Sequence, residues 1–238
     1  MSIKAILFDL DGTLLPMDQE KFARAYLGGL TVTAVNCGYE PKKMSDAILA
    51  GTVAMVKNNG DRTNEEAFWE VLIAAIGEGV RADIGMFDEF YRTDFQKVKY
   101  VCGFDPRARE IVDCVKAEGY RIALATNPLF PRIATESRIL WAGLTPSDFE
   151  LFTTFEESRH CKPNLDYYRD VLAALDLSPE ECVMVGNDVG EDMIASRLGM
   201  KTFLLTDCLI NRKEEDISAY PHGGVDELIA FIKGLKNA

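Results

Sequence analysis

The chain begins with a short apolar segment that ends at two aspartates. Ile3–Phe8 is rich in branched and aromatic side chains, and Asp9-Leu10-Asp11-Gly12-Thr13 follows directly. This pattern is typical of a buried parallel strand, and ligands bind beyond the carboxyl ends of such strands. Alternate residues of an extended chain share a side, so Asp9 and Asp11 can converge on one reacting centre. For this pentapeptide alone, a solvated Asp-Gly turn is the alternative.

Similar apolar runs recur along the chain and alternate with helix-like segments. This alternation predicts a doubly wound, Rossmann-like α/β fold with a parallel sheet. The further predicted strands are Arg121–Ala125, Leu151–Thr154, Cys182–Val185 and Thr202–Leu205, and the helices lie at about Pro106–Glu118, Pro131–Ala142, Leu165–Leu175 and Glu191–Leu198.

The segment after the first strand breaks this rhythm. Its apolar residues recur at helical spacing in Phe22–Val35, Met44–Val56 and Ala67–Ile76, and no convincing strand lies among them. We therefore expect residues 1–16 and 101–238 to form the catalytic core and residues 17–100 to form an inserted, all-helical cap. The crossings near Pro16–Asp18 and Lys99–Gly103 are expected to act as the hinge.

Composition narrows the range of partners. The chain has 38 acidic and 26 basic residues, a net charge of -12, which disfavours binding to nucleic acid or to an anionic membrane surface. No apolar stretch is long enough to cross a bilayer, and the start lacks a signal-peptide layout, so a cytoplasmic location is expected. The six cysteines include no C-x-x-C pair, which favours reduced thiols.

Two further segments carry groups suited to binding an anion. Ala125-Thr126-Asn127 ends the second predicted strand, where a hydroxyl and a backbone N–H can both bond a phosphoryl oxygen. In Cys161-Lys162-Pro163 the proline biases Lys162 toward extended backbone and so fixes the departure of its side chain. Taken singly, an ordinary turn and a solvated lysine are the alternatives.

An acidic loop follows another predicted strand. In Val183-Met184-Val185-Gly186-Asn187-Asp188-Val189-Gly190-Glu191-Asp192 the apolar run ends in carboxylate and amide side chains. Oxygen ligands of this kind suit a hard cation that retains several waters, which indicates Mg²⁺. A solvated acidic loop is the alternative for this segment taken alone.

These four segments resemble, in order, the four motifs of the haloacid dehalogenase-like superfamily, whose first motif is D-x-D-G-T. The resemblance covers Ile3 to about Leu205. It implies that Asp9 is the nucleophile and that Asp11 protonates the leaving oxygen and later activates water. It also implies phosphate binding by Thr126, Asn127 and Lys162, charge neutralisation by Lys162, and Mg²⁺ ligands that include Asp9 and the main-chain oxygen of Asp11.

The fourth motif departs from the commoner Gly-Asp form, because Asn187 directly follows Gly186. Either Asn187 stands at the first acidic position, five residues before Asp192, or Asp188 does, four residues before it. Magnesium is usually held by one or two carboxylates, so we expect Asp188 to be the ligand. Asp192 is then expected to bond a metal-bound water or to orient Lys162, and Asn187 to order the loop.

The expected activity is magnesium-dependent hydrolysis of a small phosphorylated metabolite through an aspartyl phosphate. The intact pair of Asp9 and Asp11 favours phosphoryl transfer, because family members that expel halide need no proton donor. A sugar-phosphate mutase of the same superfamily and a catalytically silent regulatory binding protein are the alternatives. The substrate and the oligomeric state stay open at this stage.

Overall fold

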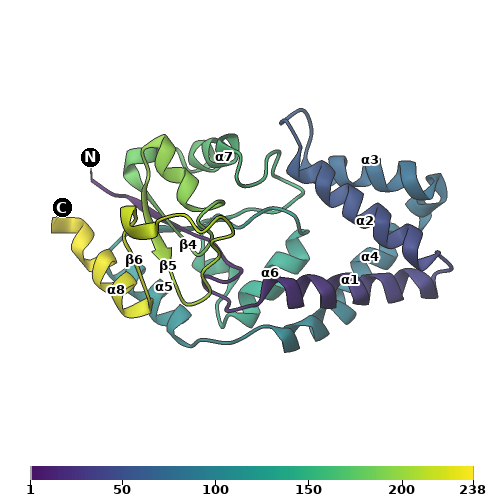
Figure 1. Ribbon diagram of the computed structural model, residues 1–238, viewed down its shortest axis with the longest axis horizontal. Helices are drawn as coiled ribbons and strands as arrows, with labels where there is room; N and C mark the ends of the chain where they lie inside the picture. The colour runs from purple at the N-terminus through teal and green to yellow at the C-terminus, as the bar shows by residue number, and fades with distance from the viewer. Residues whose placement is uncertain (1, 238) are drawn as a thin grey trace.

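The computed structural model describes residues 2–237 and contains one six-stranded parallel sheet. The strand order is β3-β2-β1-β4-β5-β6, which is a doubly wound arrangement and confirms the predicted fold class. Figure 1 labels β4, β5 and β6 of this sheet. The strands are β1 (Ala5–Phe8), β2 (Arg121–Leu124), β3 (Leu151–Phe152), β4 (Cys182–Gly186), β5 (Lys201–Leu205) and β6 (His222–Gly223).

Helices cover both faces of this sheet. They are α5 (Arg107–Ala117), α6 (Arg132–Trp141), α7 (Leu165–Leu175) and α8 (Val225–Gly234). Side chains of β1 alternate between the two faces: Ala5 and Leu7 pack in the cluster that includes residues of α7, whereas Ile6 and Phe8 pack with residues of α5 and α8. A strand that is buried on both faces has to be apolar throughout, which explains the unbroken run at its start.

The last predicted helix of the motif region forms only a short 3₁₀ segment. Met193–Leu198 is six residues long, and Gly199 ends it in a left-handed conformation with φ of 98°. Asp192, just before this segment, turns its side chain inward to Lys162 and to the main-chain N–H of Asp188. The chain therefore begins to coil after Asp192 and not at Glu191.

Residues 18–100 are helical throughout, with short turns, and they contain no strand, as predicted. The helices are α1 (Gln19–Asn36), α2 (Pro41–Val56), α3 (Asn64–Ile76) and α4 (Ile84–Arg92), with 3₁₀ segments at Glu78–Asp83 and Asp94–Val101. Side chains cap three of them: Asp18 accepts from two main-chain N–H groups of α1, Glu40 does so for α2, and Thr63 forms a capping box with Glu66 at α3.

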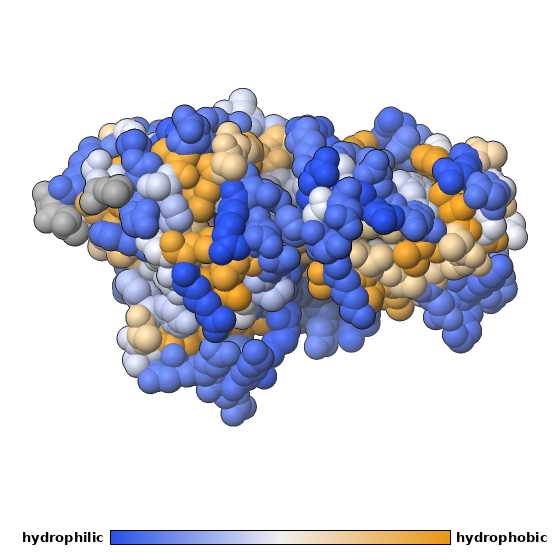
Figure 2. Space-filling view, turned by 90° about the horizontal axis from the view of Figure 1, so that it is seen from above, coloured by the Kyte–Doolittle hydropathy of each residue, from blue (hydrophilic) through white to orange (hydrophobic). Residues whose placement is uncertain are grey.

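These helices lie together beyond one end of the sheet, opposite the two chain termini (Figure 1). A recess lies between the helical part and the sheet part on the lower side of the space-filling view (Figure 2). The two crossings between the parts run side by side. Met17 and Cys102 form an isolated antiparallel β-bridge, and the N–H of Gly103 donates to the carbonyl of Pro16 at 2.7 Å. Within residues 2–237, no helix is long and apolar enough to cross a membrane.

A third connection between the two parts is made by the N-terminus of α3. The main-chain N–H of Asn64 donates to the carbonyl of Ser158 at 2.8 Å, and its buried side-chain amide reaches the Cys161 sulfur at 3.3 Å. The N–H of Glu65 donates to the carbonyl of Phe155 at 2.9 Å. In this conformation the helical part is therefore held to the core at more places than the two predicted crossings. The division into core and cap stays a prediction.

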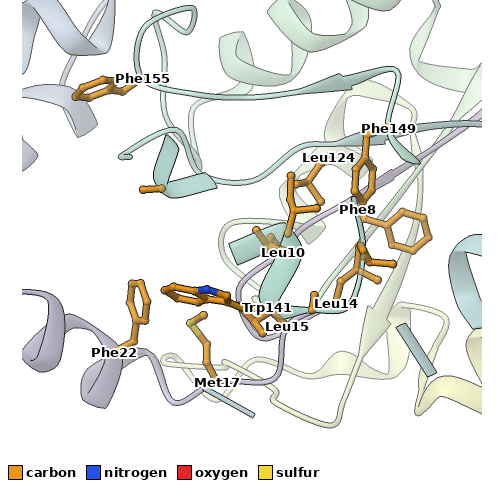
Figure 3. Packing of buried hydrophobic residues seen from close by; sticks show 14 of the residues in the cluster. Phe8, Leu10, Leu14, Leu15, Met17, Phe22, Leu124, Trp141, Phe149 and Phe155 are labelled. Carbon is orange, nitrogen blue, oxygen red and sulfur yellow. The ribbon is translucent and has the colours of Figure 1, made fainter. Parts of the chain in front are cut away.

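The apolar core is continuous beneath the end of the sheet at which the motifs lie. Figure 3 shows Phe8, Leu10, Leu124 and Phe149 gathered around the strands, while Phe22 and Phe155 lie apart, toward the helical part. The loop after β1 is consequently anchored from below by apolar side chains. This anchoring fixes the direction in which its two aspartates project.

Candidate active site

Three of the predicted motifs meet at the carboxyl ends of neighbouring strands. The hydrogen-bond ladder continues past the strands, because the N–H of Asp9 donates to Val185 at 2.9 Å and the N–H of Ala125 donates to Phe8 at 2.7 Å. Asp9 is therefore level with Ala125 and Gly186, and Thr126 and Asn187 follow one residue further along the two adjacent strands. This is the position at which open parallel sheets bind ligands.

Asp9 is buried and both of its carboxylate oxygens are engaged. The Lys162 ammonium donates to Oδ1 at 2.9 Å, and the Thr13 hydroxyl donates to Oδ2 at 3.2 Å. Gly12 between them has φ of +97°, and a β-carbon there would lie 2.3 Å from Nδ2 of Asn187. Both the left-handed backbone and this close approach require glycine, which explains the Asp-Gly-Thr part of the motif.

Lys162 is buried and joins two carboxylates. Its ammonium lies 2.9 Å from Oδ1 of Asp9 and 2.6 Å from Oδ1 of Asp192. Burial alone would lower the pKa of Lys162, but the charges of Asp192 and Asp9 together raise that pKa well above its ordinary value. Lys162 is therefore a cation held beside Asp9, and its contact with Asp192 is the one that an orienting role of Asp192 would need; that role stays a prediction.

Asp11 does not share a partner with Asp9, because it pairs with an arginine that the sequence analysis did not select. Arg138 of α6 is fully buried and donates from Nη1 to Oδ2 of Asp11. Its guanidinium also lies 4.4 Å from the centre of the Phe130 ring. Burial raises the pKa of Asp11 to about 6, and the charge of Arg138 opposes that rise. The pKa of Asp11 is thus near the value that suits a group that both gives and takes a proton close to neutral pH.

The signal that could have identified Arg138 is its position within its helix. Ala134, Arg138 and Trp141 recur at spacings of four and three residues, and all three are buried. A charged residue on the buried stripe of a helix needs a partner of opposite charge, and here that partner is Asp11. The sequence alone shows the unusual position of Arg138 but not which acid it meets.

The predicted phosphate-binding residues lie beside these groups. Thr126 is buried, and its carbonyl accepts from the hydroxyls of Thr153 at 2.6 Å and Tyr167 at 2.9 Å, which hold the main chain in place. Asn127 donates from Nδ2 to the carboxylate of Glu191 at 3.0 Å. Burial raises the pKa of Glu191. Glu191, a second residue without an assigned role in the sequence analysis, thus orients Asn127.

Asn187 and Asp188 point in different directions. The Asn187 amide accepts from the Thr13 hydroxyl at 3.0 Å and donates to the Cys208 carbonyl at 2.7 Å. Thr13 also donates to Asp9, so the Asn187 oxygen and the Asp9 carboxylate share this hydroxyl as a partner. Oδ1 of Asp188 instead accepts the N–H groups of Gly190 and Glu191, and its Oδ2 pairs with Arg212 at 2.7 Å. The assignment of Asp188 as the Mg²⁺ ligand stays a prediction. Both Asp188 oxygens already have partners, whereas Asn187 shares the Thr13 hydroxyl with Asp9, so these contacts favour Asn187 as the ligand.

The oxygen atoms around Asp9 suit a hard cation. Within residues 2–237, no three His, Cys, Asp or Glu side chains converge as a metal site, so main-chain and amide oxygens would have to complete one. Among the hydrogen bonds of residues 2–237, the main-chain carbonyl of Asp11 accepts only one, a long contact of 3.4 Å from the Gln19 amide, so this oxygen could bind a cation. Oδ1 atoms of Asp11 and Asn127 are buried without a partner in the described part of the chain. Magnesium held by few protein ligands and several waters fits this arrangement.

The fold and this site define an α/β enzyme whose reacting groups lie on the loops after parallel strands. A family model for haloacid dehalogenase-like hydrolases matches residues 3–198, and the chain belongs to that family.

Named relatives are phosphatases. Glyceraldehyde 3-phosphate phosphatase of Methanothermobacter thermautotrophicus is 24% identical over 90% of this chain and 91% of its own length. The enzyme of the same name from Methanocaldococcus jannaschii is 30% identical, but the match spans only 51% of this chain and 53% of the relative. Pyrophosphatase PpaX of Bacillus cereus is 24% identical over 85% of this chain and 82% of the relative.

The fold also has solved counterparts. A HAD phosphatase from Thermococcus onnurineus superposes with a TM-score of 0.59 at 17% identity and covers 98% of this chain and 99% of its own. At this identity the likeness concerns the fold alone.

Proposed function

We propose that this chain is a magnesium-dependent phosphatase that hydrolyses a small phosphorylated substrate through a phosphoaspartate on Asp9. The observation that carries the proposal is the buried Asp9 carboxylate, which lies 2.9 Å from the Lys162 ammonium at the carboxyl end of the sheet. Membership of a hydrolase family and the names of the relatives support it.

The chain's residues divide the reaction into two displacements at phosphorus. In the first, a carboxylate oxygen of Asp9 bonds to phosphorus, the bond from phosphorus to the leaving oxygen breaks, and protonated Asp11 gives that oxygen its proton. In the second, Asp11 takes a proton from water, the water oxygen bonds to phosphorus, and the Asp9–phosphorus bond breaks. Inorganic phosphate is released and Asp9 is restored.

The other site residues bind and orient. Lys162 places a fixed positive charge beside Asp9, where the transferring phosphoryl group carries its negative charge. Thr126 and Asn127 would donate hydrogen bonds to the phosphoryl oxygens. Arg138 is a positioning residue, because it holds Asp11 without reaching Asp9 in the described contacts.

Magnesium would be held by the Asp9 carboxylate, the main-chain oxygen of Asp11 and the Asn187 amide oxygen, and it supplies positive charge that makes phosphorus open to attack by an anion. We expect chelation with EDTA to abolish phosphate release from a generic ester such as p-nitrophenyl phosphate, and added Mg²⁺ to restore it. Full turnover in EDTA, after dialysis that leaves no bound metal by elemental analysis, would contradict a magnesium-dependent mechanism.

A pair of substitutions tests which residue of the fourth motif faces the metal. Asn187→Asp adds an anionic oxygen at the proposed ligand, so the Mg²⁺ concentration for half-maximal turnover should fall by about 10-fold. Asp188→Asn keeps an oxygen that can accept from Gly190 and Glu191, so its Mg²⁺ requirement should change little.

The reverse pattern would restore the expectation drawn from the sequence. If Asp188→Asn raised the magnesium requirement sharply while Asn187→Asp left it unchanged, Asp188 would be the ligand. Thermal melting of both variants controls for disorder of the loop.

A further inference from the structure

A cavity of about 300 Å³ lies between the helical part and the candidate active site. Eight of the 19 residues that line it are aromatic and six more are aliphatic or Met. The aromatic walls come from α1, α3 and α4 and from the core loops, and they include Phe22 of α1, Trp69 of α3 and Phe155 after β3, whereas α2 contributes no aromatic residue. Some of these rings pack edge to face, as Trp69 and Phe87 do at 5.1 Å between ring centres, and others stack, as Tyr26 and Tyr91 do.

Most non-aromatic polar side chains of this cavity lie at the loops after the strands, and Thr52 of α2 is an exception. Asp11, Asn127 and Glu191, which follow β1, β2 and β4, line it together with Gln19. Asp11 is the proposed proton donor to the leaving oxygen. A phosphate ester with its phosphorus at Asp9 would therefore place the leaving oxygen near Asp11 and the remainder of the leaving group among the aromatic rings.

The charge of the lining restricts what that remainder can be. Asp11 and Glu191 are the charged residues among the described lining, which contains no Lys, Arg or His. The buried guanidinium of Arg138 lies against the Phe130 ring but is already paired with Asp11. A second phosphate or a carboxylate on the substrate would be buried beside two acids with no cation of its own, whereas an apolar group gains from burial.

We propose, on the basis of the phosphatase function proposed above, that the substrate is a monoester whose leaving alcohol is uncharged and apolar, with a ring or branched hydrocarbon. An apolar cavity of about 150 Å³ accommodates benzene, so this one has room for roughly two rings. Such a substrate differs from glyceraldehyde 3-phosphate and pyrophosphate, for which the relatives are named. A sugar-phosphate mutase is disfavoured for the same reason, because its substrate is polar.

Three esters of primary alcohols test this inference without differences in leaving-group reactivity. 2-Phenylethyl phosphate carries the aromatic group, glycerol 3-phosphate a neutral polar group and 3-phosphoglycerate an anionic one. We expect kcat/KM for 2-phenylethyl phosphate to exceed both others by at least about 100-fold. Equal or faster turnover of either polar ester would overturn the inference and leave the phosphatase function standing, whereas no phosphate release from any ester would contradict that function.

Binding to the cavity can be measured without turnover. The chain has 2 tryptophans, so Trp141→Phe leaves Trp69 of the cavity wall as the single indole fluorophore. Titration with 2-phenylethanol should change the Trp69 emission saturably, and glycerol should not. An emission that responds to neither alcohol would overturn the inference even if the enzyme proved inactive.

A matched pair of lysine substitutions on α2 tests the charge argument. Leu49 lines the cavity and is 46% exposed, whereas Val53 is 49% exposed and is not among the residues of the lining. Leu49→Lys should lower the ratio of kcat/KM for 2-phenylethyl phosphate to kcat/KM for 3-phosphoglycerate by roughly 10-fold, because it brings a cation to the cavity. Val53→Lys should leave the preference unchanged. Equal effects of both substitutions would contradict the assignment of this cavity to the leaving group.

Discussion

Asp9→Asn should lower kcat by at least about 10³-fold, which corresponds to a loss of roughly 4 kcal/mol of transition-state stabilisation. The amide is nearly isosteric with the carboxylate, but it is neutral and a far weaker nucleophile toward phosphorus. Its oxygen can still accept from Lys162, so the buried contact at 2.9 Å is compatible with the substitution and the fold should persist. The measurement is steady-state phosphate release at saturating Mg²⁺.

Asp113→Asn is the matched control for this experiment. Asp113 lies on the surface of α5 with a side chain that is 60% exposed, and it makes only a 3.4 Å contact with Arg109 among the described salt bridges. Its substitution removes the same charge far from the candidate site, so turnover should match the wild type. If Asp9→Asn retained more than about a thousandth of wild-type kcat, covalent catalysis by Asp9 would be excluded.

Lys162→Met should reduce both turnover and stability. The methionine fills most of the volume but leaves Asp9 and Asp192 buried without the cation that lies 2.9 Å from one and 2.6 Å from the other. Removal of one partner from a buried ion pair costs about 3–5 kcal/mol of unfolding free energy. Loss of a fixed positive charge at the phosphoryl group should lower kcat by about 10²- to 10³-fold. Urea unfolding and phosphate release measure the two effects separately.

Lys201→Met provides the comparison, because Lys201 is an exposed lysine at the start of β5. It should change neither quantity appreciably. A Lys162→Met enzyme with wild-type kcat would show that the ammonium is not needed at the phosphoryl group, whatever its effect on stability. If Lys162→Met kept wild-type stability but lost turnover, Asp9 and Asp192 would not form a buried charged cluster with Lys162.

The sequence predicts the central strands well because burial on both faces leaves a strong apolar signal. The predicted run at Cys182–Val185 differs from β4 by a single residue. The edge strand β6 and helix α8 were not predicted. His222–Gly223 has only two residues, so no periodicity can reveal it, and α8 follows Gly224 without a preceding strand pattern to mark an α/β unit. Helix α4 was also missed, because nine residues between two 3₁₀ segments give a short pattern.

The candidate site likewise contains residues that the sequence predicts and residues that it does not. Asp9 and Lys162 are 153 positions apart, and the sequence brings them together because each stands at the end of a recognisable segment. The pairing of Asp11 with Arg138 depends on how α6 packs against the loop after β1, and such a tertiary contact has no local signature. The aromatic cavity is likewise assembled from four helices and four core loops, so its residues look like ordinary core positions in the sequence.

In the proposed mechanism phosphate becomes covalently attached to Asp9, and trapping of this acyl phosphate tests that step most directly. Enzyme that is turning over p-nitrophenyl phosphate with Mg²⁺ can be quenched and reduced with borohydride, which converts an aspartyl phosphate to homoserine. Peptide mass spectrometry should then find homoserine at position 9 in the wild type but not in enzyme quenched without substrate. Active turnover with unmodified Asp9, or homoserine at another aspartate, would contradict the account.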